Sequence, residues 1–270
     1  MREIIAIVFL LGLLGLVVGW GIYRLSRTQF SPLQTLLWLI AQLLTKFLWR
    51  ATTPDALPLP AGQGAVVVCN HRSSVDPFFV QVATGRKVHW MVAREYCEHW
   101  AFGPFLRACE VIPVNRGGMD IRSVKAAIRI TSDGGLIGMF PEGRINMTEQ
   151  FMLPGRPGAG WIALKARCLV LPCYIEGSPY RGTAWSPFFM TARVTIRFGT
   201  PLDFSEYFGR EGEAGVLEDM LRRCQKAIAE LAGQSDFEPR IAGRNWKPTP
   251  EELAADMDAA DQRRRERGSG

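Results

Sequence analysis

Six short apolar runs alternate with segments of helical pattern, and this alternation constrains the fold of the chain more than any other feature. Each run holds five to eight residues, which is the usual length of a buried strand. The segments between the runs are long enough for helices. The pattern therefore predicts an α/β fold, with a central, mostly parallel or mixed sheet flanked by helices. The six predicted strands are 65–70, 89–93, 111–115, 136–140, 168–175 and 192–198.

Two of the helices are predicted clearly by their apolar periodicity. In segment 120–135, apolar residues recur at positions i, i+3 and i+7, and Gly134 provides a C-terminal cap. Segment 212–233 has the amphipathic pattern of a helix that packs on a domain surface. A chain of 270 residues has room for one large domain, which we place at residues 53–235.

The N-terminus carries an uncharged run of twenty residues, from Ile4 to Tyr23. A helix needs about 20 apolar residues to cross a bilayer, so residues 1–29 are predicted to form a transmembrane anchor. A cleaved secretory signal is the alternative, but its apolar core is shorter, about 7–15 residues, and no small-residue cleavage site follows this run. Arg24 and Arg27 directly behind the run favour an inner-membrane protein whose main domain faces the cytoplasm.

Residues 30–52 are predicted to form an amphipathic helix that lies in the headgroup layer of the membrane. Ser31 followed by Pro32 is a helix-start signal, and polar residues recur on one face of the predicted helix. Trp38, Trp49 and nearby basic residues suit a membrane interface. A buried core helix is the alternative. The net charge of +6 arises mostly in the first fifty residues, which indicates membrane lipids rather than nucleic acid as partner.

The rest of the sequence carries weaker signals. Residues 236–270 are predicted to be a polar tail, with one last helix starting at a capping box at Thr249. The six cysteines lack the spacing of metal ligands, and in a cytoplasmic domain we expect them to be reduced. The histidines have no obvious ligand partners, so we predict no metal site and no bound cofactor.

A polar cluster after the first predicted strand holds His71 and, five residues later, Asp76. On a continuous helix five residues advance about 500°, which would keep the two side chains apart. If the strand ends at Asn70 and a helix begins at Ser73 or Ser74, the carboxylate can fold back onto the imidazole. It would then fix the tautomer of the ring and leave the other nitrogen free to take a proton from an alcohol. Such a pair is a catalytic triad whose serine is replaced by the hydroxyl of the substrate.

The spacing Asn-His-x-x-x-x-Asp-Pro, which begins at Asn70, resembles the first conserved block of the glycerolipid and lysophospholipid acyltransferases. Three further blocks follow in the order of that family. The second ends at Arg116, the third is the Phe-Pro-Glu-Gly-Arg stretch at residues 140–144, and the fourth is the apolar strand around Pro172. The resemblance covers residues 65–177, and four blocks in order are far more specific than any one of them.

The resemblance implies an O-acyltransferase that moves a fatty acyl group from acyl-CoA or acyl carrier protein to the hydroxyl of a lysophospholipid. It implies that His71 is the general base and that Asp76 orients it, with no covalent enzyme intermediate and no cofactor beyond the acyl donor. It also implies five substrate-binding residues: Asn70, Arg116, Glu142, Gly143 and Arg144.

Among these, Arg116 is implied to bind the phosphate of the acceptor, for which a guanidinium is well suited. Glu142 is implied to orient the acceptor through a hydroxyl or through Arg116, and Gly143 to let the backbone approach it closely.

Three alternatives follow from the same residues. The acceptor expected first is 1-acylglycerol-3-phosphate, but another lysophospholipid or a lyso-ornithine lipid is also compatible, because Arg144 follows Gly143 directly where the family usually has an intervening threonine. A non-catalytic lipid-binding protein would have little need of both His71 and Asp76. A thioesterase, in which the histidine activates water, would have little need of an arginine placed to bind phosphate.

Overall fold

Six strands form one sheet in the computed structural model, which describes residues 29–115 and 120–243. Their order across the sheet is β3-β2-β4-β1-β5-β6, and neighbours are parallel except for β5 and β6, which are antiparallel. The predicted mixed α/β sheet is therefore confirmed, and each predicted strand is present. The strands are β1 (Ala65–Cys69), β2 (Val88–Ala93), β3 (Ile112–Val114), β4 (Leu136–Met139), β5 (Leu169–Glu176) and β6 (Thr195–Phe198).

The central strand β1 is buried along its whole length. A parallel strand that is covered on both faces needs no polar alternation, which explains the continuous apolar run in the sequence. Val68 lies opposite Met139 of β4, and Cys69 lies opposite Cys173 of β5. The carboxyl ends of β1 and β4 consequently meet at one edge of the sheet, the edge at which open α/β sheets bind their ligands.

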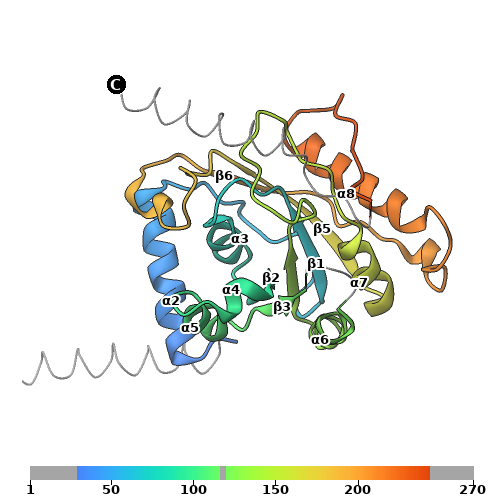
Figure 1. Cartoon of the computed structure of the whole chain (residues 1–270), viewed down its shortest axis with the longest axis horizontal. Coiled ribbons are helices and arrows are strands. Elements are labelled where there is room, and N and C mark those ends of the chain that lie inside the picture. Colours follow the sequence, from blue (N-terminus) through green and yellow to red (C-terminus); the bar gives the residue numbers. More distant parts are fainter. Residues whose placement is uncertain (1–28, 116–119, 244–270) are drawn as a thin grey trace, which may run out of the picture.

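Helices cover both faces of the sheet (Figure 1). On one face Val67 of β1 shares a core with Phe79, while on the other face Val68 shares a second core with Ala163 and Ile228. The first face is covered by α3 and the second by α6, α7 and α8. The helices are α2 (Pro32–Leu43), α3 (Asp76–Thr84), α4 (Arg94–Glu98), α5 (Gly103–Ala108), α6 (Ile121–Ser132), α7 (Gly158–Ala166) and α8 (Val216–Leu231), with a π-helical turn η1 (Leu44–Leu48) and 3₁₀ turns η2 (Ser186–Phe189) and η3 (Ser205–Tyr207).

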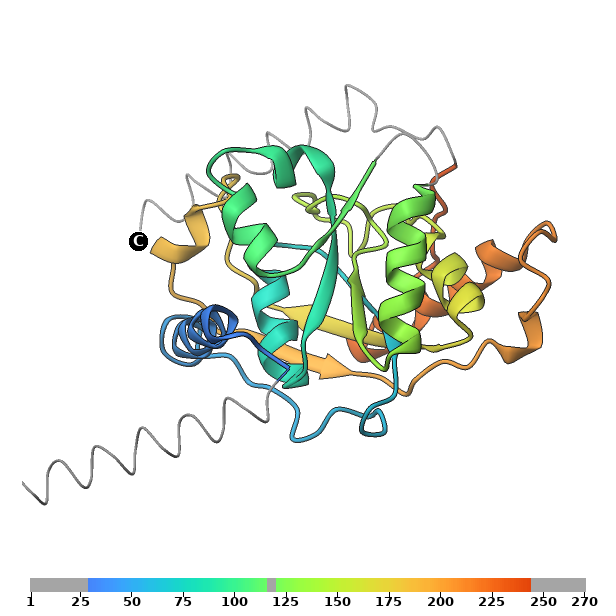
Figure 2. The same ribbon diagram turned by 90° about the horizontal axis from the view of Figure 1, so that it is seen from below.

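Helix α2 lies at the edge of the molecule, outside α3 (Figures 1 and 2). Its predicted start is confirmed, because Ser31 and Gln34 form a reciprocal capping box. The polar Gln34 is buried, and its side-chain nitrogen donates to the carbonyl of Ala108 and to the carboxylate of Glu110, both at 2.8 Å. Six large apolar side chains of α2 and η1 are exposed instead: Leu33, Leu36, Leu39, Ile40, Leu43 and Phe47.

The polar side of α2 therefore faces the protein and its apolar side faces outward, which is the reverse of a surface helix in a water-soluble domain. This arrangement does not fit the alternative of a buried core helix. No helix within 29–115 and 120–243 combines the length and the apolar character that crossing a membrane requires. The predicted anchor at residues 1–29 lies outside the residues that the structure describes, except for residue 29. The helix predicted from Thr249 also lies outside them.

Part of the predicted polar tail packs on the domain. The N–H of Gly155 donates to the carbonyl of Arg240, and the N–H of Ala242 donates to the carbonyl of Gly155. Phe237 also packs edge-to-face on Phe151, with ring centroids 5.1 Å apart. The chain just beyond residue 236 is thus part of the folded domain.

Candidate functional site

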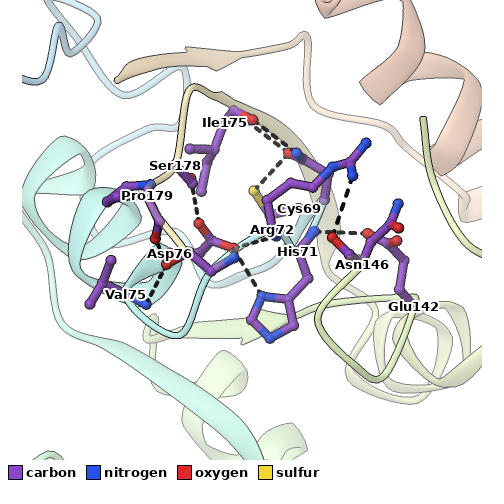
Figure 3. A network of polar contacts seen from close by, with 12 residues as sticks. Cys69, His71, Arg72, Val75, Asp76, Glu142, Asn146, Ile175, Ser178 and Pro179 are labelled. Atoms are coloured by element: carbon purple, nitrogen blue, oxygen red, sulfur yellow. Dashed lines mark hydrogen bonds and ion pairs between the residues drawn. The ribbon is translucent and has the colours of Figure 1, made fainter. Parts of the chain in front are cut away.

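His71 and Asp76 meet at the carboxyl end of β1, where Figure 3 shows the imidazole beside the carboxylate. Nδ1 of His71 lies 2.9 Å from Oδ2 of Asp76. The His71 side chain is 15% exposed and the Asp76 side chain is fully buried. The predicted fold-back is therefore present, although helix α3 begins at Asp76 itself rather than at Ser73 or Ser74.

The Asp76 carboxylate is surrounded by hydrogen-bond donors. Oδ2, besides facing His71, accepts from the backbone N–H groups of Arg72 and Ser73, each at 2.7 Å. Oδ1 accepts from the hydroxyl of Ser178 at 2.6 Å. The spacing of the motif follows from this geometry, because the four residues between His71 and Asp76 form a loop tight enough to direct two N–H groups at one oxygen.

The pairing with Asp76 sets the chemistry of the imidazole. A carboxylate oxygen accepts but does not donate, so in the neutral ring we assign the proton to Nδ1 and a lone pair to Nε2. Among residues 29–115 and 120–243, His71 forms a side-chain hydrogen bond only through Nδ1. Nε2 is thus available to take a proton from a bound molecule.

Sequence reasoning did not identify Ser178, which lies just beyond β5. Gly177, at a φ of 78°, turns the chain between the strand and this serine. The same loop is fastened to the motif a second time, because the hydroxyl of Ser73 donates to the carbonyl of Pro179 at 2.6 Å. The available signal was positional: β5 is the parallel neighbour of β1, so residues that follow it lie at the same edge of the sheet as His71.

Asn70 is buried and connects the end of β1 to β5. Its Oδ1 accepts from the N–H of Ile175 at 2.8 Å, and its Nδ2 donates to the carbonyl of the same residue at 2.9 Å. Both ends of the amide are thus used to fix the point at which the chain leaves the sheet toward His71. Contact between Asn70 and a substrate stays a prediction.

Glu142 is also buried, at 2% exposure. Its Oε1 accepts from the N–H of His71 and its Oε2 from the N–H of Leu153, both at 2.8 Å. Burial raises the pKa of Glu142 from 4.5 to about 7, although these two hydrogen bonds and the nearby Arg72 act in the opposite direction. Because backbone groups take both oxygens, this carboxylate fastens the backbone of His71 to the loop that follows β4.

The side chain of Arg72 also binds the loop that follows β4. Its guanidinium donates to the carbonyls of Thr148 and Gln150, each at 2.6 Å. The N–H of Asn146 donates to the carbonyl of His71 at 2.7 Å. The histidine is consequently held between two loops by its own backbone as well as by its ring.

The remaining predicted residues lie in or near this loop. Gly143, at a φ of 68°, forms an exposed turn directly after Glu142, in a backbone region that favours glycine. Arg144 follows it and is half-buried. Arg116 lies outside the residues that the structure describes, two positions beyond the end of β3.

The described part of the chain contains no group of three or more histidine, cysteine or acidic side chains that could hold a metal ion. The six cysteines are free of disulfide bonds. Cys69, one residue before Asn70, is buried, and burial raises the pKa of its thiol well above the ordinary value.

The chain is similar to known acyltransferases. Residues 52–176 match the family model described as Acyltransferase. The chain is 27% identical over 177 residues to a 1-acyl-sn-glycerol-3-phosphate acyltransferase of Bacillus subtilis, covering 64% of this chain and 85% of that protein. It is 27% identical over 188 residues to the protein of the same name from Streptococcus pneumoniae, covering 68% of this chain and 65% of that protein.

The fold is also found in a solved structure. The crystal structure of the 1-acyl-sn-glycerophosphate acyltransferase PlsC from Thermotoga maritima superposes with a TM-score of 0.53 at 18% identity, covering 80% of this chain and 89% of that one.

The buried Glu142 should make the stability of the domain depend on pH. Between pH 4.5 and 7 the unfolded chain releases this proton while the folded chain retains it, so the free energy of unfolding should fall as the pH rises, by about 3 kcal/mol in all. Glu142→Gln removes the titration. Denaturant unfolding of both proteins at pH 5, 6 and 7 should show the stability advantage of the unaltered protein shrinking along the series, and an advantage that grows with pH would contradict the raised pKa.

Proposed function

Since this chain belongs to the acyltransferase family, we propose that it transfers a fatty acyl group to the hydroxyl of a lysophospholipid. The observation that carries the proposal is the buried Asp76 paired with Nδ1 of His71, which leaves Nε2 available as a base. The two bacterial relatives are 1-acyl-sn-glycerol-3-phosphate acyltransferases, which supports 1-acylglycerol-3-phosphate as the acceptor and phosphatidate as the product.

In the proposed reaction, Nε2 of His71 takes the proton of the acceptor hydroxyl as its oxygen attacks the thioester carbonyl of acyl-CoA or acyl carrier protein. The new C–O ester bond forms and the C–S bond breaks. The imidazolium then returns the proton to the leaving thiolate. Asp76 stabilises the positive ring through Nδ1–H and, with its own burial and hydrogen bonds, keeps the ring in one orientation.

The phosphate of the acceptor is proposed to bind to arginines beside His71. Arg116 comes two positions after β3, which runs parallel to its neighbour β2, and Arg144 follows the exposed turn at Gly143. A guanidinium binds a phosphate through two parallel hydrogen bonds. Asn70 and Glu142 are proposed to support this surface from beneath, because their polar atoms bond to the backbone.

Membrane attachment is proposed to involve α2 in addition to the anchor predicted at residues 1–29. The exposed leucines of α2, together with Phe47, form an apolar surface that suits the acyl region of a bilayer. Lys46 and Arg50 at the end of this segment suit anionic headgroups. A lysophospholipid and its product both live in the bilayer, so a site held at its surface can exchange them without moving their chains through water.

The proposed base predicts that His71→Ala abolishes the reaction. General base catalysis contributes on the order of 100-fold to 10,000-fold, so we expect a loss of at least about 100-fold. Membranes carrying the chain are incubated with 1-acylglycerol-3-phosphate and labelled acyl-CoA, or labelled acyl carrier protein, and the lipids are resolved. His89→Ala is the matched control, since the ring of His89 bonds to the carbonyl of Glu110 away from Asp76.

Labelled phosphatidate from the unaltered chain and from the control alone is the expected result. Activity of a few per cent or more in His71→Ala would remove His71 from the role of base. Free fatty acid as the main product would identify a hydrolase, and turnover only with other lysolipids would change the acceptor.

Ser178→Ala should lower kcat about tenfold with little change in KM, because a buried oxygen of Asp76 loses its donor. Ser178→Thr, which keeps a hydroxyl, should restore most of the rate. Ser74→Ala is the control. The hydroxyl of Ser74 donates to the carbonyl of Ala184, which follows Ser178 along the chain, and not to Asp76. Equal losses in Ser178→Ala and Ser74→Ala would mean that the loop is merely loosened.

Glutamates placed on the apolar side of α2 should impair access to membrane-held substrate. Leu36→Glu with Leu43→Glu puts two charges where side chains are 54% and 58% exposed. We expect the rate on acceptor held in vesicles to fall about tenfold, and the rate on a short-chain, water-soluble acceptor to persist. Ile121→Glu, at a side chain 63% exposed on α6, is the matched control. Equal rates on the vesicle acceptor in all three proteins would contradict the membrane role of α2.

A further inference from the structure

Two aromatic rings are stacked beneath the imidazole of the proposed base. The imidazole of His71 and the ring of Phe140 are nearly parallel, at an angle of 7°, with centroids 3.8 Å apart. Phe140 is stacked in turn on Trp90, at an angle of 15° and a centroid distance of 4.6 Å. One face of the imidazole is therefore covered by an aromatic ring that is itself backed by an indole.

The backbone makes room for this stack at Gly138. Trp90 of β2 lies opposite Gly138 of β4, and Phe140 comes directly after β4. A Cβ atom at Gly138 would lie 2.7 Å from Cδ2 and Cε3 of the Trp90 indole and 2.8 Å from Cγ1 of Val88. Trp90 and Val88 are buried, so neither side chain has open space into which it could move. The glycine thus permits the indole to lie across β4 and reach Phe140.

The geometry of the stack suits a charged imidazole better than a neutral one. Two neutral aromatic rings prefer offset or edge-to-face packing with centroids about 4.5–7 Å apart, since their negative faces repel each other. A cationic ring over the face of an aromatic ring is attracted to the negative charge of that face. The close, nearly parallel contact of His71 with Phe140 is therefore most favourable when the imidazole carries the proton taken from the acceptor.

We propose that Phe140 and Trp90 are positioning residues that hold the plane of the His71 ring and stabilise its positive charge during acyl transfer. The hydrogen bond to Asp76 fixes one edge of the imidazole but permits the ring to tilt about that edge. The stack removes the tilt and so directs Nε2 toward one place. An interaction that strengthens as the charge develops lowers the barrier rather than tightening substrate binding. This inference rests on the proposed role of His71 as the base.

The kinetic test compares substitutions that remove a ring with substitutions that keep one. Phe140→Leu should lower kcat about tenfold with KM for both substrates within about twofold, and Phe140→Tyr should retain most of the rate. Trp90→Leu and Gly138→Ala should each lower kcat by about threefold or more, and Trp90→Phe should lower it less than Trp90→Leu. Phe204→Leu is the control, because it removes a buried ring stacked on Tyr207 in the other core.

A second measurement does not depend on activity. The chain has three histidines, so a histidine-labelled sample of the full chain in detergent gives few imidazole signals, and His71→Ala identifies the one from His71. Ring protons that lie over the face of Phe140 should resonate upfield, and Phe140→Leu should move them downfield. If this signal shows the stack but the unaltered chain transfers no acyl group, the proposed function is wrong, whereas the stacking of His71 on Phe140 still holds.

Three results would overturn the inference. The first is a folded Phe140→Leu protein with unchanged kcat. The second is a loss of kcat in Phe140→Tyr, or in the control Phe204→Leu, that equals the loss in Phe140→Leu. Such a result would indicate that the Phe140 ring contributes packing alone. The third is a His71 signal that does not respond to the loss of the Phe140 ring.

Discussion

The fully buried carboxylate of Asp76 is the group on which the arrangement of the site depends. A buried carboxylate is costly unless donors surround it, and here the donors come from separate parts of the chain. Two are backbone N–H groups of the loop before α3, one is the ring of His71, and one is the hydroxyl of Ser178 beyond β5. These donors meet only when β5 lies beside β1. The orientation of the imidazole therefore depends on the pairing of these two central strands.

Glu142 is a second buried acid that holds His71 in place. Asp76 holds the ring of the histidine, whereas Glu142 holds its backbone N–H and joins it to Leu153. The two acids differ in surroundings: Asp76 lies at the first turn of a helix, and Glu142 lies in a loop where burial raises its pKa to about 7. Each acid fixes the position of the histidine, but burying an ionisable group costs the folded domain stability. Such a loss of stability in return for a fixed geometry is common at functional sites.

The sequence was sufficient to predict what depends on local pattern and spacing. The apolar runs predicted the strands, and the histidine–aspartate spacing predicted a fold-back that brings the two side chains together. It could not predict Ser178, which is 102 residues from Asp76, because no periodicity marks a serine for a partner so distant. The contacts that hold α2 against the domain were also beyond reach, since the burial of Gln34 depends on partners near residue 110. The stack on Phe140 depends on Gly138, which leaves room for Trp90 of the neighbouring strand β2.

The hydroxyls of the loops around His71 bear on the proposed source of the nucleophile. Ser73 donates to the carbonyl of Pro179 and Ser178 donates to Asp76, so neither proton is available to Nε2 of His71. The thiol of Cys69 is buried with a raised pKa, and a protonated thiol is a poor nucleophile. These observations support the proposed reaction, in which the acceptor itself supplies the attacking group and takes the acyl group directly from the donor. Direct transfer requires both substrates beside His71 at once, which gives a physical reason for holding the ring by its edge, its face and its backbone together.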